Sequence, residues 1–107
     1  MDCIFCEIIA GTAPADFRYQ STEFIIIVNK LTWVPTMLLA IPTQHMSQQE
    51  LWKNPMLPKL SEQLINLGSR LVPCGFRILS NFGPDAMQSQ QHAHIHLIGG
   101  VQLGPYA

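Results

Sequence analysis

The stretch 92–98, His92-Ala93-His94-Ile95-His96-Leu97-Ile98, decides how this chain folds. Histidines alternate with apolar residues, and side chains on a β-strand alternate between its two faces. The pattern predicts a strand whose apolar face joins the core while three imidazoles line the other face at spacings of about 6.5–7 Å. The chain has four histidines, and three of them lie in this stretch.

Three interpretations of the histidine face can be compared. A solvent-facing polar side is disfavoured, because Ser, Thr or Lys would serve equally well. A three-His zinc site of the hydrolytic type needs the rings to converge on one point, which successive same-side residues on a flat strand do poorly. Nucleophilic catalysis fits better: a neutral imidazole can attack phosphorus while an acceptor holds its other nitrogen, and its neighbours can donate to phosphate oxygens.

The segment before this strand, residues 81–89, reads Asn81-Phe82-Gly83-Pro84-Asp85-Ala86-Met87-Gln88-Ser89. Its Gly, Pro and Asp predict a turn between two strands. Gln88 and Ser89 come just ahead of the histidines. Their amide, hydroxyl and backbone N–H groups could cradle phosphate oxygens without adding positive charge.

The remaining elements predict an α+β fold of about five antiparallel strands with one main helix and a short N-terminal helix. Apolar, β-branched runs predict strands over Phe24–Val28, Pro35–Ile41 and Gly75–Ser80. Leucines at helical spacing predict a helix from about Pro58 to Leu71. A short helix over Cys3–Ala10 should stop at Gly11, and Ser47 should cap a helical turn with Glu50 completing a capping box.

Cysteines at 3 and 6 form a CxxC motif, Cys3-Ile4-Phe5-Cys6. Two thiolates at this spacing commonly supply half of a tetrahedral zinc site, with redox or packing roles as alternatives. The other half must come from elsewhere in the chain. His45 is the histidine outside the 92–98 stretch, and taken alone it reads as an ordinary surface residue. Cys74 is isolated and is expected to pack in the interior.

Composition predicts one domain, residues 1–107, in the cytoplasm. Hydrophobic residues make up 48% of the chain and charged residues 12%, about half the usual share, which favours self-association. The net charge is −1 and the six basic residues are dispersed, so we expect no nucleic-acid partner. No apolar run reaches transmembrane length and no secretory signal pattern opens the sequence, so we expect no membrane partner and reduced cysteines.

Taken together, these motifs resemble the histidine-triad (HIT) family, in its zinc-containing, nucleoside phosphoramidase-like branch. The stretch 92–98 is similar to the family signature His-φ-His-φ-His-φ-φ, where φ is apolar. Residues 81–89 resemble its Asn-x-Gly-x-x-x-x-Gln-Ser loop, and Ile41-Pro42-Thr43-Gln44-His45 resembles its Ile-Pro-x-x-His segment. Residues 3–11 look like the N-terminus of the zinc-containing members.

The resemblance implies a homodimer that hydrolyses or transfers the α-phosphate group of a purine nucleotide, such as a nucleoside phosphoramidate. It implies that His94 is the nucleophile and forms a nucleotidyl-histidine. The other implied roles are listed by type: phosphate contacts from His96 and Ser89; positioning of the phosphate by Asn81 and Gln88; ribose contact by Asn29; and one structural zinc per subunit held by Cys3, Cys6, His45 and His92.

The chain departs from the usual family pattern at Met37, where members usually carry a histidine. Met37 cannot donate a hydrogen bond or relay a proton, and we expect it to pack in the core. Asn29 stands where many members carry Asp, and an amide offers a single acceptor oxygen. These positions leave two functions open: an enzyme acting on a nucleotide, and a nucleotide-binding regulatory protein with weak or lost catalysis. A third hypothesis is a purely structural zinc protein, in which His94 and His96 could be replaced without consequence.

Overall fold

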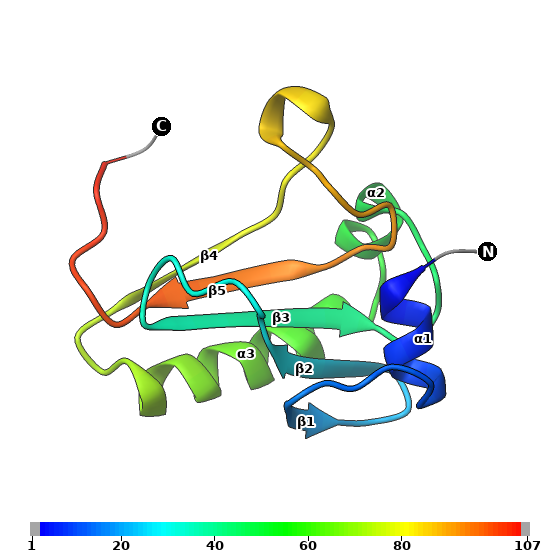
Figure 1. Cartoon of the computed structure of the whole chain (residues 1–107), viewed down its shortest axis with the longest axis horizontal. Coiled ribbons are helices and arrows are strands. Elements are labelled where there is room, and N and C mark those ends of the chain that lie inside the picture. Colours follow the sequence, from blue (N-terminus) through cyan, green and yellow to red (C-terminus); the bar gives the residue numbers. More distant parts are fainter. Residues whose placement is uncertain (1–2, 106–107) are drawn as a thin grey trace.

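The computed structural model describes residues 3–105 and shows the predicted α+β fold (Figure 1). Five antiparallel strands form one sheet in the order β1-β2-β3-β5-β4. The strands are β1 (Phe17–Gln20), β2 (Phe24–Val28), β3 (Thr36–Pro42), β4 (Phe76–Leu79) and β5 (Ile95–Gly99). The helices are α1 (Ile4–Ala10), α2 (Gln48–Trp52) and α3 (Leu57–Leu71), with a 3-10 turn, η1, at Pro84–Ala86.

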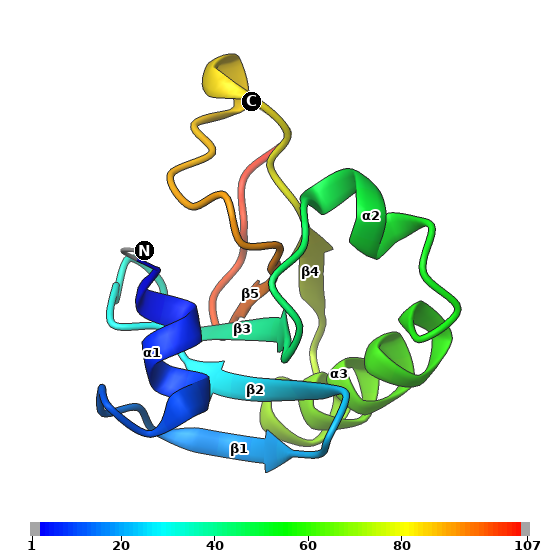
Figure 2. The same ribbon diagram turned by 90° about the vertical axis from the view of Figure 1, so that its right-hand side faces the viewer.

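Helix α3 covers one face of the sheet and α1 covers part of the other (Figure 2). The leucines of α3 pack on alternate residues of the strands, and Leu60 and Leu64 are fully buried there. Gly68 is explained by this packing, because a Cβ at that position would come within 2.8 Å of the side chains of Leu97 and Phe76. A glycine lets the helix approach the sheet closely, which offsets its poor helix propensity.

Helix α1 ends where its sequence predicts. Gly11 adopts the left-handed conformation, with φ of 83°, and its N–H bonds the carbonyls of Glu7 and Ile8. At the other end, the Sγ of Cys3 accepts a hydrogen bond from the N–H of Cys6. The CxxC motif therefore forms the first turn of α1, with both sulfurs at the same helix end.

Two strands differ from the sequence-based expectation. Strand β1 was not predicted, although Phe17 and Tyr19 alternate with polar residues, because the pattern is only four residues long. Strand β5 begins at Ile95 rather than His92. Its ladder with β3 stops at the pair Ala40–Ile95, and Pro42 cannot extend it because proline has no N–H to donate.

The three cysteines are free thiols, but Cys74 is exposed and the expectation that it packs in the interior is wrong. It lies in the turn between α3 and β4, where the chain leaves the helix at the surface. Within residues 3–105 no helix has the length and apolar character needed to cross a bilayer.

Candidate active site and metal centre

His94 and His96 lie together on the face of the sheet that α1 partly covers. Their ring centroids are 5.0 Å apart, while Ile95 and Leu97 point into the opposite core. The predicted alternation is therefore right for these residues. His92 lies before the strand begins, but its ring still contacts Phe5 of α1, as that of His94 does, and it also reaches the cysteines.

Hydrogen bonding fixes which nitrogen of His94 carries the proton. Its Nδ1 is 2.9 Å from the carbonyl oxygen of His92, which can only accept, so Nδ1 donates. Nε2 then carries the lone pair, and it forms no hydrogen bond within residues 3–105. Burial lowers the pKa of His94, partly opposed by its bond to the His92 carbonyl. The ring is therefore neutral near pH ~7, the form that can act as a nucleophile.

His96 is held neutral more strongly. Burial, with a smaller contribution from the neighbouring His94, lowers the pKa of His96 to about 4. Its Nε2 is buried and has no hydrogen-bond partner within residues 3–105. Buried polar groups normally have a partner, so an unsatisfied ring nitrogen beside a cavity points to a ligand atom or a water.

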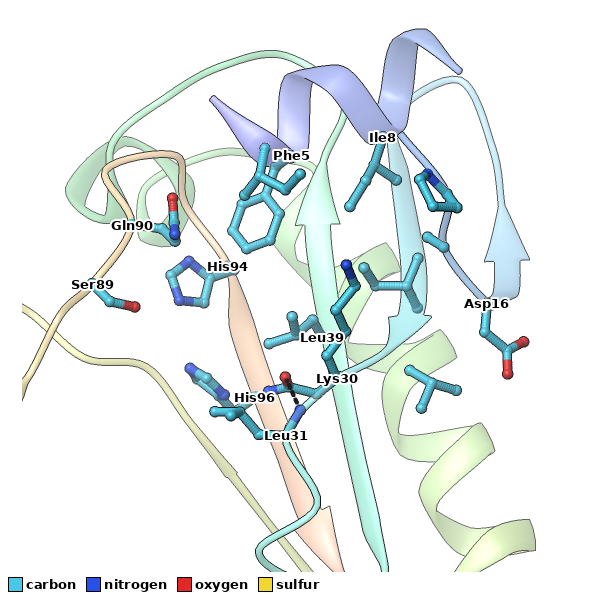
Figure 3. Close-up of a pocket in the computed structure, with 16 residues that line it drawn as sticks. Phe5, Ile8, Asp16, Lys30, Leu31, Leu39, Ser89, Gln90, His94 and His96 are labelled. Atoms are coloured by element: carbon cyan, nitrogen blue, oxygen red, sulfur yellow. Dashed lines mark hydrogen bonds between the residues drawn. The ribbon is translucent and has the colours of Figure 1, made fainter. Parts of the chain in front are cut away.

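The two rings line a cavity of about 420 Å³ between α1, β2 and the loop that precedes β5 (Figure 3). Apolar side chains form much of its wall, and Lys30 and Asp16 are its charged members. The apolar wall includes Phe5, Ile8 and Ile27, and the polar lining includes Asn29, Ser89, Gln90, His94 and His96. Clefts of this size, apolar with a few polar groups, are typical of small-molecule sites.

The structure divides the predicted nucleotide-binding residues into two groups. Asn29 and Ser89 line the cavity with His96, as the predictions require. Asn81 and Gln88 lie outside this lining. Gln88 instead braces the loop internally, because its Oε1 accepts from Gly83 N–H at 2.8 Å and its Nε2 donates to Gln90 C=O at 2.9 Å.

Asn29 also serves its own turn. Its Oδ1 accepts a hydrogen bond from the N–H of Leu31 at 3.0 Å, the bond drawn in Figure 3. One lone pair of Oδ1 and the side-chain NH₂ group remain for a ligand. Met37 is buried in β3 opposite Ile98, consistent with the expected packing role.

The four predicted metal ligands come together at the N-terminal end of α1. One donor atom from each of Cys3, Cys6, His45 and His92 lies within 4.8 Å of the others. His92 is prepared for this role, because its Nε2 is 2.8 Å from the carbonyl of Pro42 and must donate to it. Its Nδ1 lone pair then faces Sγ of Cys3 at 3.4 Å and Sγ of Cys6 at 3.5 Å. Metal-ligating histidines usually donate their other N–H in this way, so the residues can hold a metal.

Sequence reasoning missed Gln48 and Gln90. Gln90 lines the cavity from the loop that Gln88 braces. Gln48 is 1% exposed and bonds the main chain of His94. The capping box of Ser47 and Glu50 was predicted correctly and is present. The box does not indicate that Gln48, rather than Gln49, is the buried glutamine between them.

Because the pKa of His96 is lowered in the folded state, the stability of the protein should depend on pH. A folded-state pKa of about 4, below the reference value of about 6.5, means that the unfolded chain binds the proton more readily. Stability should therefore be full above pH ~6.5 and decline as the pH falls toward ~4. The melting temperature of the metal-loaded protein should fall between pH ~7 and ~5, and His96→Asn should make that decline shallower. An equal decline in His96→Asn would contradict the assignment.

Comparisons with known proteins identify the family of the chain. A family model described as HIT domain matches residues 10–103. The whole chain is 35% identical to a HIT-like protein of Chlamydia muridarum, 88% of which it covers. It is 30% identical to a 14 kDa zinc-binding protein of Brassica juncea, with 95% of this chain and 96% of that protein covered.

The fold is also that of a solved relative. A HIT family hydrolase from Clostridium thermocellum superposes with a TM-score of 0.89 at 28% identity, covering 98% of this chain and 96% of the other. Because the HIT model matches residues 10–103 and the 35% identical relative matches the whole chain, this chain belongs to the HIT family.

Proposed function

We propose that this protein is a nucleotide hydrolase or transferase that acts at the α-phosphate of a nucleoside phosphoramidate or related substrate through a nucleotidyl-His94 intermediate. The observation that carries the proposal is the state of His94. Burial lowers the pKa of its ring, the His92 carbonyl accepts from its Nδ1–H at 2.9 Å, and the ring lines a cavity of about 420 Å³. Nε2 then attacks phosphorus while the bond from phosphorus to the leaving amine breaks, and the amine nitrogen takes a proton from solvent. Water then attacks the nucleotidyl group and the bond to Nε2 breaks, which releases AMP and restores the imidazole.

The cavity supports a division of labour among its residues. Apolar walls formed by Phe5, Ile8 and Ile27 suit a purine base, and Asn29 lies where a ribose hydroxyl could bond its free lone pair or NH₂ group. Ser89 and His96 offer neutral donors to the phosphate oxygens.

For Asn81 and Gln88, outside the lining, we propose an indirect role. They shape the loop that presents Ser89 and Gln90 to the phosphate. Gln88 does so through its bonds to Gly83 N–H and Gln90 C=O.

The metal at Cys3, Cys6, His45 and His92 is proposed to be one structural zinc per subunit. Two thiolates and two imidazoles are a ligand set typical of tetrahedral structural zinc. The zinc would supply stability by tying α1 to residues 45 and 92. The chemistry itself would remain with the histidines of the cavity.

The proposal is tested by incubating the protein with adenosine 5′-phosphoramidate and measuring AMP release. We expect release, and rapid acid quenching should trap a protein species heavier by one nucleotidyl group. If the protein binds AMP but releases none from the phosphoramidate, the regulatory alternative is supported. The observation that favours this alternative is Met37, which has no side-chain group that can relay a proton. A protein that neither binds AMP nor releases it from the substrate would contradict both alternatives.

We also propose that the protein is a homodimer. Large apolar side chains remain exposed on the single chain, among them Trp33 at 77% and Met87 at 80%. Exposed apolar surface of this kind commonly marks an interaction site. Light scattering at micromolar concentration should give twice the mass of the chain, and a monomer would contradict the proposal.

A further inference from the structure

We propose that Gln48 is a positioning residue for His94, whose amide acts as a substitute strand partner for the main chain of the nucleophile. The expected effect of Gln48 on turnover rests on the proposed function, in which His94 is the nucleophile. The contacts that carry it are independent of any substrate.

His94 lies just before the residues of β5 that pair in the sheet. Strand β5 begins one residue later, at Ile95, and the last pair between β3 and β5 is Ala40–Ile95. The main-chain N–H and C=O of His94 are therefore outside the ladder although the residue is buried, at 3% exposed. Buried main-chain groups without partners are costly, so other groups must bond them.

The segment that enters α2 supplies those bonds, and it runs beside the segment that enters β5 (Figure 2). The N–H of Ala93 donates to the carbonyl of Met46 at 2.8 Å. One residue on, the N–H of His94 donates to Oε1 of Gln48 at 3.2 Å, and Nε2 of Gln48 donates to the carbonyl of His94 at 3.1 Å.

An amide is the side-chain group that matches this task. It offers one acceptor and a donor group at the spacing of a peptide, so it can bond both main-chain groups of one residue. Nε2 of Gln48 also donates to the carbonyl of Asn81 at 3.3 Å. Gln48 thus joins both ends of the loop between Asn81 and His94, which carries Ser89 and Gln90.

Two further contacts make the position specific. The capping box of Ser47 and Glu50 fixes the first turn of α2, so Gln48 starts from a rigid main chain. Oγ of Ser80 donates to the carbonyl of His94 at 3.0 Å, a second bond to the same oxygen. Gln48 does not line the cavity and is 1% exposed, so it acts on substrate indirectly, through the main chain of His94 and the loop that begins at Asn81.

The test uses Gln48→Glu, which keeps the shape but replaces the donor to two carbonyls by an oxygen. Its matched control is Gln49→Glu, the exposed neighbour with the same change of charge in the same helical turn. We expect Gln48→Glu to lower kcat for phosphoramidate hydrolysis by about 10- to 100-fold, because small displacements of a reacting group cost this much. KM and the Kd for AMP should stay within about twofold of the control.

A second readout does not depend on turnover. Long-range ¹⁵N–¹H NMR of the wild type should show His94 protonated at Nδ1 alone, and Gln48→Glu should show mixed tautomers or broadened signals. If the wild type shows no turnover but Gln48→Glu still changes the tautomer of His94, the positioning role is upheld and the proposed function is contradicted. Turnover and tautomer both unchanged in Gln48→Glu would overturn the positioning role.

Should Gln48→Glu fail to fold, Ser80→Ala decides the question, because it removes one bond to the same carbonyl. We expect it to fold and to lower kcat by about three- to tenfold with KM unchanged. A kcat equal to that of the wild type would overturn the inference.

Discussion

Replacing His94 by alanine should lower kcat for AMP release by at least about 10³-fold, the largest effect expected of any single substitution. The reason is that no other group can take over the attack. His96 is proposed to donate its N–H to a phosphate oxygen, so its nitrogen that faces the phosphate carries a proton and has no lone pair for the attack. Loss of the nucleophile removes the covalent route entirely, and the residual rate comes from binding and phosphate contacts alone.

The measurement should separate chemistry from folding and binding. His94→Ala should bind AMP within a few-fold of the wild type, and acid quenching should give no nucleotidyl adduct. Gln91→Ala provides the control, since Gln91 is exposed and lies in the same segment three residues earlier. A kcat within tenfold of the control, or an adduct on another residue, would exclude His94 as the nucleophile.

The fold could be predicted from the sequence where local pattern and burial coincide. Strand β2 was predicted with its observed bounds, Phe24–Val28, because a run of β-branched residues is buried on both sides. Helix α3 and the capping box of α2 were predicted for the same kind of reason, since each depends on spacing along one segment. Strand β1 was missed because four residues give too short a pattern.

The start of β5 was mispredicted because its pairing is set by residues far away in the chain. Alternation of histidines with apolar residues indicates a strand from His92, but Pro42 ends the ladder on the neighbouring strand. The same distance hid Gln48, whose bonds span 46 residues of sequence. Local reasoning placed it in a helical first turn, and only the packing of α2 against the entry to β5 turns it inward.

The candidate site shows the same division. His94, His96, Ser89 and Asn29 were found by motif and do line one cavity. Gln90 was missed because its position depends on how Gln88 folds the loop. A motif thus identifies the residue types that a site needs, while loop geometry decides which of them reach the cavity.

Removing the metal should produce the second large effect, this time on stability. We expect purified protein to contain about one zinc per chain, and chelation to lower the free energy of unfolding by at least about 4 kcal/mol, the value for a ligand present at a thousand times its Kd. Among residues 3–105, the long-range side-chain hydrogen bonds at α1 are those of Cys3 and Cys6 with His45 and His92. Without the ion, the four residues are joined only by hydrogen bonds between thiols and imidazoles, which are weaker than metal–ligand bonds.

The test compares melting temperatures of zinc-loaded and chelated protein, and of Cys3→Ser with Cys74→Ser. Cys3→Ser should lose the metal and melt at least about 10 °C lower. Cys74→Ser should match the wild type, because that thiol is exposed and lies outside the cluster. A chelated protein that melts at the same temperature as the loaded one would contradict a structural zinc.

Metal loss should also affect His94, because His92 contacts both the metal cluster and the His94 ring. His92 offers its ring to the cluster and its carbonyl to Nδ1 of His94. Without the metal, the His92 ring keeps its bond to the Pro42 carbonyl but loses its second anchor. The His92 carbonyl is then held less firmly, and the bond that keeps His94 in its attacking tautomer weakens. Chelated protein that is still folded at low temperature should therefore show a lower kcat with AMP binding little changed, and the ¹⁵N signals of His94 should shift. Unchanged signals would mean that the metal stabilises α1 without positioning the nucleophile.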